Sequence, residues 1–245
     1  MKRKTKLIIL CAAAVVVCIS AILILLYCGV LHINNPSKSD YPVNGVDVSA
    51  YQGDIDWQLL SGQDISYAYI KATEGSSHTD KYFEYNWENA GKYGLRIGAY
   101  HFFSFESAGK TQAEHFCETV SAVDGMLPPV VDVEFYGGFK TAADINVDDI
   151  TAQLRDFVNT LTEEYGMKPV IYVSEETYEI IVKGRFDDCD LWYRSVYSKI
   201  PEDVKWKFWQ YSNRHCLEGY NGEENFIDMN VFNGSAEEFV SYPDR

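Results

Sequence analysis

Apolar residues form one long unbroken run near the start of the chain, over residues 7–31, and only short runs after it. The 25 residues of this run include no charged side chain. A helix rises about 1.5 Å per residue, so roughly 20 residues cross the ~30 Å hydrocarbon core of a bilayer. The pattern therefore predicts one transmembrane helix ahead of the rest of the chain.

The residues on either side of this run predict its orientation. Four lysines and arginines lie within residues 1–6, and the next one is Lys38. Because positive charge is retained on the cytoplasmic side, we expect residues 1–6 to be cytoplasmic and the chain after residue 31 to be extracytoplasmic. A cleaved signal peptide is the alternative, but its apolar run is shorter, about 7–15 residues, and ends at small residues. We therefore expect an uncleaved, single-pass anchor in the cell membrane.

After the anchor, residues 32–43 are polar and include two prolines, which is typical of a linker. Short β-rich runs then follow, with helical patterns between the earlier ones over residues 80–93, 107–123 and 147–165. Ser107 is the expected N-cap of the second of these helices. The last three strands have only short connections. The expected strands are residues 45–49, 67–73, 96–103, 129–134, 169–174, 191–197, 207–212 and 226–232.

Alternation of strand and helix over the first five strands predicts a parallel sheet that closes into a barrel. Residues 44–245 form one domain that is short for a (β/α)8 barrel, which usually takes about 250 residues. The missing helices near the end account for the difference. An open doubly wound sheet is the alternative, but the sequence has no GxGxxG or GxxxxGK motif to mark its phosphate site.

Charge excludes one class of function. Beyond residue 6 the chain carries 17 basic against 36 acidic side chains, and the net charge of the whole chain is −15. Such a body is repelled by nucleic acid phosphates, so we expect no nucleic acid partner. The cysteines show no CxxC spacing, and the sequence gives no support for a zinc site or another cofactor.

Acidic residues stand at the carboxyl ends of several predicted strands, where barrel enzymes carry their chemistry. Asp47 lies in the first strand and Asp228 in the last, and Asp132 and Glu134 share the fourth. The last two are at positions i and i+2, so both side chains point to one face of an otherwise apolar strand. Buried carboxylates without partners are costly, so this pattern indicates a functional site.

Clustered carboxyl groups suit glycoside hydrolysis, because one acid must donate a proton while another faces positive charge in the transition state. A Ca²⁺ or Mg²⁺ site is the alternative, but no loop carries dense Asp and Asn ligands, and we expect no metal. Tyr100, Trp209 and Tyr211 flank strand ends where rings can stack on sugars, and Gln210 adds a polar partner.

Several motifs together resemble the glycoside hydrolase family 25 lysozymes, also called Chalaropsis-type muramidases. The resemblance covers about residues 44–235. The motifs follow in the family's order: Gly45-Val46-Asp47-Val48-Ser49, Tyr51-Gln52-Gly53, Ile55-Asp56-Trp57, Ile70-Lys71-Ala72-Thr73-Glu74-Gly75, Gly98-Ala99-Tyr100-His101-Phe102, Val131-Asp132-Val133-Glu134, Trp209-Gln210-Tyr211 and Ile227-Asp228-Met229-Asn230.

The resemblance implies a TIM-like (β/α)5(β)3 barrel as the catalytic domain, residues 44–245, behind the anchor. It implies hydrolysis of the β-1,4 bond between N-acetylmuramic acid and N-acetylglucosamine in peptidoglycan. Glu134 matches the general acid/base, and Asp132 matches the carboxylate that supports the N-acetyl group or the anomeric charge. Asp47 and Asp228 match acids that line the site and tune the pKa of Glu134.

Peptidoglycan glycan strands are therefore the expected partner, together with the membrane. The expected substrate contacts are Tyr100, His101, Tyr172, Trp209, Gln210 and Tyr211. One departure from the family pattern is Arg194, which stands in the sixth strand where a small residue is usual. Two other functions stay open at this stage: a peptidoglycan-binding module without activity, and chitinase-like cleavage of an N-acetylglucosamine polymer.

Overall fold

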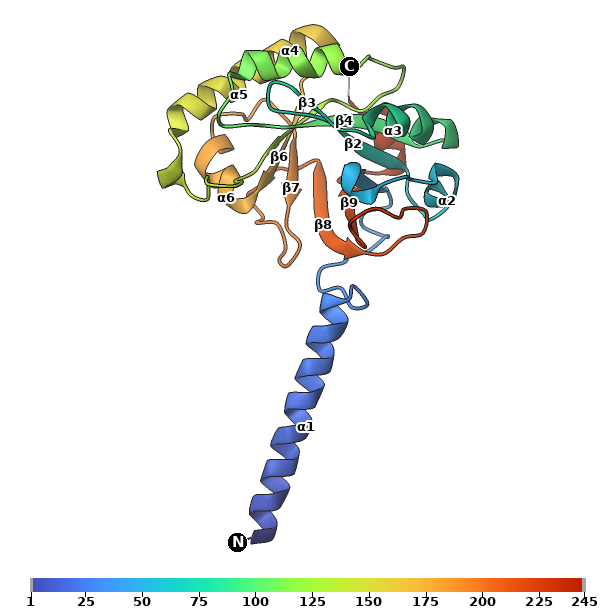
Figure 1. The fold of residues 1–245 in the computed structure, drawn as a ribbon, viewed down its shortest axis with the longest axis vertical. Coiled ribbons are helices and arrows are strands. Elements are labelled where there is room, and N and C mark those ends of the chain that lie inside the picture. Colours follow the sequence, from blue (N-terminus) through green and yellow to red (C-terminus); the bar gives the residue numbers. More distant parts are fainter. Residues whose placement is uncertain (1, 244–245) are drawn as a thin grey trace.

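The structure, a computed structural model, describes residues 2–243 and contains a barrel and one long helix that projects from it (Figure 1). This helix, α1 (Lys2–Tyr27), contains an 18-residue stretch with a mean hydropathy of 3.2 and is not buried against the barrel. It ends four residues before the predicted limit, because Gly29 adopts a left-handed conformation with φ 67°. Its length and composition are those of a membrane anchor or a signal sequence.

Eight strands close into a barrel, and each predicted strand is present. They are β1 (Asn44–Val48), β2 (Tyr67–Glu74), β4 (Arg96–Phe102), β5 (Val130–Val133), β6 (Val170–Ser174), β7 (Leu191–Arg194), β8 (Phe208–His215) and β9 (Ile227–Phe232). The two-residue strand β3 (His78–Thr79) folds back on the end of β2. Pairing of β1 with both β2 and β9 closes the ring.

The barrel is mixed rather than wholly parallel, which corrects the expectation of a parallel sheet. Strand β9 runs antiparallel to both of its neighbours, β8 and β1. Only residues 216–226 connect β8 to β9, and a parallel crossover usually needs a dozen residues or more and a helix. A short connection of this kind returns the chain in the opposite direction.

Five strand–helix units precede the last three strands, so the (β/α)5(β)3 architecture is confirmed. The helices are α2 (Trp57–Ser61), α3 (Phe83–Ala90), α4 (Gly109–Thr119), α5 (Val147–Tyr165) and α6 (Glu175–Thr177), with α7 (Ala236–Ser241) after the barrel. Single turns of other helix types are η1 (Ala50–Gln52), η2 (Gly91–Tyr93), η3 (Ala142–Asp144) and η4 (Tyr178–Val182).

Helix α5 has the predicted limits, with Asn146 accepting a hydrogen bond from the Asp149 amide at its start and Gly166 at its end. Helix α4 is shorter than residues 107–123, and Ser107 is not its N-cap. The N-cap is Ala108, whose side chain cannot accept a hydrogen bond. Instead, the amide of Gly109 donates to Oε1 of Gln153 in α5, at 2.8 Å. A tertiary contact thus replaces the local cap.

Apolar side chains pack in two layers, as strand alternation requires. One layer lies between the strands and the surrounding helices and includes Val131 and Val133 of β5. The other fills the inside of the barrel with large rings such as Tyr69, Trp192 and Phe208. At the carboxyl ends of the parallel strands, this inner layer leaves space for a pocket.

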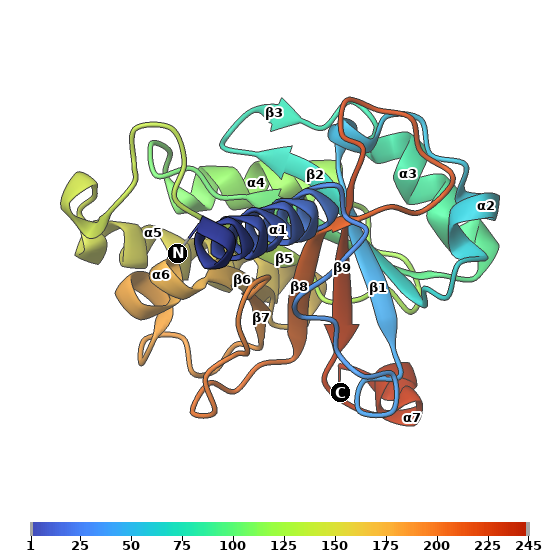
Figure 2. The same ribbon diagram turned by 90° about the horizontal axis from the view of Figure 1, so that it is seen from below.

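The predicted linker, residues 32–43, lies against the part of the barrel that lacks helices. Asn34 donates to the backbone oxygens of Ser195 and Ser198, at 2.8 and 2.6 Å. The Tyr41 ring packs near Trp209 on the outer face of β8, with 6.1 Å between ring centroids. Figure 2 shows this segment running from the end of α1 past β8 to the start of β1.

Candidate active site

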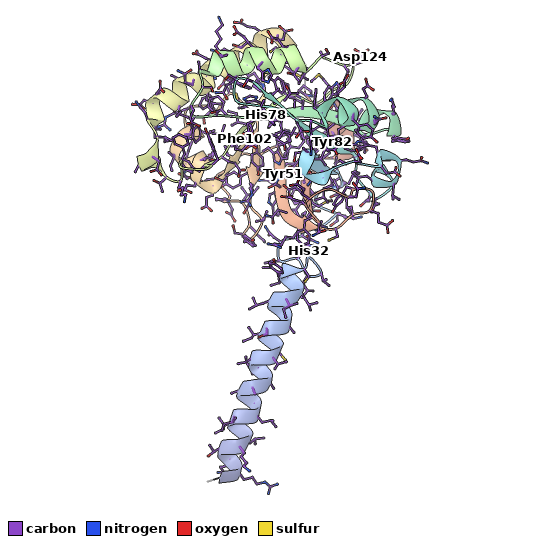
Figure 3. All side chains as sticks on the ribbon, in the orientation of Figure 1. His32, Tyr51, His78, Tyr82, Phe102 and Asp124 are labelled. Carbon is purple, nitrogen blue, oxygen red and sulfur yellow. The ribbon has the colours of Figure 1, made fainter. Side chains whose placement is uncertain are left out.

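A pocket of about 370 Å³ opens at the carboxyl ends of the parallel strands. All four predicted catalytic acids line it, although they come from three different strands and the residues that follow them. Two of its rings, Tyr51 and Phe102, are labelled over the middle of the barrel in Figure 3. The acids of the pocket are Asp47, Glu74, Asp132, Glu134, Glu224 and Asp228.

Asp132 lies inside β5 and is 8% exposed. Its Oδ1 is buried and has no hydrogen-bond partner among the described residues. Burial and the nearby charge of Glu134 raise the pKa of Asp132 well above its usual range, against the opposing charge of Lys71. One oxygen of this carboxyl group is therefore both out of contact with solvent and without a hydrogen-bond donor, which adds to the cost of ionising Asp132.

Glu134 follows the last residue of β5 and points into the same pocket as Asp132. Burial raises its pKa, the positive charge of Arg194 acts in the opposite direction, and the Asp47 carboxylate raises it further. A carboxyl group in this environment keeps its proton at a higher pH than an exposed glutamic acid does. That is the property that a general acid requires.

Asp47 and Asp228 face each other across the antiparallel pair β1 and β9. The side-chain amide of Gln210 donates to both, at 3.0 Å to Asp47 and 3.2 Å to Asp228. Asn230 donates a further hydrogen bond to Asp47 at 2.7 Å. Burial raises the pKa of each carboxyl group, and the charge of Asp47 adds to the effect on Asp228.

Gln210 connects these acids to the aromatic wall of the pocket. Its Oε1 accepts a hydrogen bond from the Tyr172 hydroxyl at 3.0 Å. On the other side, the indole N–H of Trp192 donates to Asn230 at 2.8 Å. The carboxylates are thus held by donors that are themselves fixed, which restricts their orientation.

Three of the six predicted substrate contacts line the pocket: Tyr100, Tyr172 and Gln210. The other three do not, and strand alternation explains why. Because Gln210 points into the barrel, its neighbours Trp209 and Tyr211 point outward and pack in the outer apolar layer. They are each 6% exposed, so they are not available to stack on a sugar in this pocket.

His101 is also outside the pocket, since it alternates with Tyr100 along β4. It is fully buried and its two ring nitrogens contact Thr73 at 2.7 Å and Gln112 at 3.0 Å. Burial lowers its pKa to about 3, so the ring is neutral at physiological pH. These contacts fix β4 to β2 and α4.

Sequence reasoning missed Tyr51, Tyr136 and Glu224 as pocket residues. Tyr51 belongs to the Tyr-Gln-Gly segment directly after β1, and Tyr136 follows Glu134 by two residues. Both could have been identified from the sequence because they lie close to predicted catalytic acids. Glu224 lies in the loop between β8 and β9, where no pattern marks it. Within residues 2–243, no group of three or more His, Cys, Asp or Glu side chains is arranged to hold a metal ion.

Comparison with known proteins adds independent information. The model of the glycosyl hydrolases family 25 matches residues 46–220, which include Asp47, Asp132 and Glu134. Among solved structures, a family 25 glycosyl hydrolase from Bacillus anthracis is similar, with 47% sequence identity and a TM-score of 0.79. The match covers 86% of this chain and 97% of that chain.

Two other proteins are similar to this chain in sequence over most of its length. Lysozyme M1 of Streptomyces globisporus is 32% identical over 212 residues, which are 79% of this chain and 69% of its own length. The uncharacterized protein YegX of Escherichia coli O157:H7 is 35% identical over 213 residues, 84% of this chain and 75% of its own.

Proposed function

Since the chain belongs to family 25 of the glycosyl hydrolases and is a lysozyme that hydrolyses peptidoglycan, we propose that it is a muramidase with Glu134 as its general acid/base. The bond cleaved is the β-1,4 bond between N-acetylmuramic acid and N-acetylglucosamine. One observation carries this proposal: Glu134 lies in a pocket beside Asp132, in surroundings that raise its pKa.

The first chemical step is proton transfer from Glu134 to the glycosidic oxygen, which leaves with the departing sugar. Positive charge then develops at the anomeric carbon. Asp132, which lines the same pocket, supports this charge or the N-acetyl group that approaches it. After cleavage Glu134 is a carboxylate and accepts a proton from the incoming water.

Asp47 and Asp228 act without contacting the reacting bond. The Asp47 carboxylate raises the pKa of Glu134, and both acids are fixed by the side-chain amide of Gln210. Tyr100, together with Tyr51 and Phe102, supplies ring faces in the pocket that suit the flat sides of sugars. We leave Trp209, Tyr211 and His101 out of the substrate-binding set.

The anchor belongs to the same proposal. Residues 7–31 stay in the cell membrane as a single span with residues 1–6 in the cytoplasm, and residues 32–43 lead to the catalytic domain of residues 44–245. The long apolar stretch of α1, which is not buried inside the structure, supports this arrangement. Peptidoglycan lies on the outer side of the membrane, so the pocket and its substrate share a compartment.

Replacing Glu134 by Gln in the full chain, solubilised in detergent, tests the assignment. The amide keeps the shape of the side chain but cannot donate an acidic proton, so we expect kcat on purified peptidoglycan to fall by about a thousandfold. The thermal unfolding midpoint shows whether the fold is preserved. Near-normal activity of a folded Glu134→Gln variant would remove Glu134 from its role.

A further inference from the structure

Arg194 ends strand β7 and faces the mouth of the barrel. In β7, Trp192 packs inside the barrel and Tyr193 packs in the outer layer, so strand alternation turns Arg194 inward. Its register partners are Ser174 of β6 and Gln210 of β8. Gln210 is one of the residues that line the pocket. Arg194 is not itself a lining residue, but its position beside Gln210 places it on the same side of the sheet as the acids, at the rim of the barrel.

The guanidinium group of Arg194 is available to bind a ligand. Among residues 2–243, it has no hydrogen bond or ion pair, although the side chain is only partly exposed. The other cation beside the acids, Lys71, is already paired with Glu74 at 2.7 Å and lies over the Phe102 ring. Four other arginines hold backbone oxygens in place: Arg96, Arg155, Arg185 and Arg214.

The position of this charge matters because the pocket is acidic. Arg194 acts on the carboxyl groups of all four central acids, lowering their pKa values against the effect of burial. An anionic substrate group that entered this pocket would be repelled unless a cation compensated for the acids. Arg194 is a cation whose charge acts on these acids, and none of its N–H donors is hydrogen-bonded within residues 2–243.

Muramic acid differs from N-acetylglucosamine by a lactyl ether that ends in a carboxyl group. We propose that Arg194 forms an anion subsite at the mouth of the pocket and binds a carboxylate of the muramyl unit through its planar fork of N–H donors. The proposal rests on the proposed muramidase function. The carboxylate has two sources, the lactyl group of peptide-free glycan and the stem peptide attached to it.

The subsite is tested by the affinity of the full-length Glu134→Gln chain, in detergent, for matched pairs of tetrasaccharides. The first pair carries lactyl carboxylates or lactyl carboxamides, and the second pair carries alanyl-glutamate stem dipeptides whose two glutamate carboxyl groups are both free or both amidated. Because a charge-assisted hydrogen bond to a carboxylate is lost in each amide, we expect Kd for the acid to be at least about tenfold lower in one pair. The pair that shows the difference identifies the source of the carboxylate.

Arg194→Met in the same background should abolish this preference, while Lys199→Met should keep it. Lys199 is exposed in the loop after β7, and its charge is not among those that act on the four central acids, so its loss removes one positive charge without changing their surroundings. Equal Kd values for acid and amide in both pairs, or a preference that survives Arg194→Met, would overturn the subsite. Failure of the muramidase proposal would be seen separately, as absence of cleavage of these tetrasaccharides by the wild-type chain.

Discussion

At the scale of single residues, Glu134 owes its proton affinity to its surroundings. Burial raises its pKa, the cation of Arg194 lowers it, and the Asp47 carboxylate raises it again. A general acid must be protonated to act, so activity is lost as the pH rises through the pKa of Glu134 in the enzyme–substrate complex. The charges of Arg194 and Asp47 therefore help to set the pH above which activity is lost.

Removing the Arg194 charge should move that limit. In Arg194→Met the carboxylate form of Glu134 loses a stabilising cation, so the pKa of Glu134 rises. The alkaline limb of kcat against pH is then expected at higher pH than in the wild type. A limb that stays in place, or moves to lower pH, would contradict the electrostatic account. Lys199→Met serves again as the control of equal charge.

Gln210 is the residue on which the orientation of two acids depends. Gln210→Met keeps the volume but removes both hydrogen bonds to Asp47 and Asp228, and leaves the Tyr172 hydroxyl without its acceptor. We expect kcat to fall at least about tenfold and the free energy of unfolding to fall by about 1–3 kcal/mol. Kinetics on peptidoglycan and urea titration check both numbers; an unchanged kcat would show that the network is only structural.

Four of the six acids that line the pocket were predicted from sequence as site residues, and the aromatic contacts were only partly predictable. Asp132 and Glu134 share a face because they are two residues apart, whatever the rest of the fold. For Trp209-Gln210-Tyr211 the same rule allows two answers, with Gln210 inward or both rings inward. The partners that decide between them, Asp47 and Asp228, lie in other strands. Only the closed barrel supplies that information.

At the scale of elements, α4 and α5 illustrate how packing replaces a local signal. Gly109 begins α4 so close to α5 that an added Cβ would overlap the backbone oxygen of Gln153. Gly109→Ala is therefore expected to lower the free energy of unfolding by about 3 kcal/mol or more, because two helices must move apart. Urea titration of the full chain in detergent measures the loss.

Gly138→Ala is the matched control for this prediction. Nothing lies within 4 Å of an added Cβ at Gly138, and no left-handed backbone is required there. Its unfolding free energy should stay close to that of the wild type. Equal effects of the two substitutions would mean that α4 and α5 are not in close contact at Gly109.

The strands and the longest helix were predictable because their patterns extend over many residues. The small elements were not: α2, α6 and α7 span 5, 3 and 6 residues, too few to show a helical period. The direction of β9 was also hidden, since alternation is the same in parallel and antiparallel strands. The direction of β9 could be inferred only from the short connection before it, residues 216–226.

At the scale of the whole molecule, the linker is part of the folded surface. Composition predicted a polar tether over residues 32–43, but no periodic pattern could show where it lies. In the structure, Asn34 is bonded to the segment after β7, and the His32 ring stacks on His215 of β8 at 3.8 Å. These contacts lie at the pocket end of β7 and β8. They hold the pocket end of the barrel near the end of α1.

Tyr41 tests whether the linker is packed. Its ring lies 5.5 Å from Trp206 and 6.1 Å from Trp209, between centroids. We expect Tyr41→Ala in the full chain to lower the free energy of unfolding by about 2–3 kcal/mol, because it removes a half-buried ring from this cluster. Tyr197→Ala is the control, since Tyr197 is 68% exposed. Equal, small effects of the two substitutions would describe a free tether instead.

The nature of the new chain ends is the most direct test of the account as a whole. The full chain in detergent is incubated with purified peptidoglycan, and the products are reduced with borohydride and identified by mass spectrometry. A muramidase leaves muramic acid at each new reducing end, and these ends should be absent with Glu134→Gln. New ends of reduced N-acetylglucosamine would contradict the proposed bond specificity.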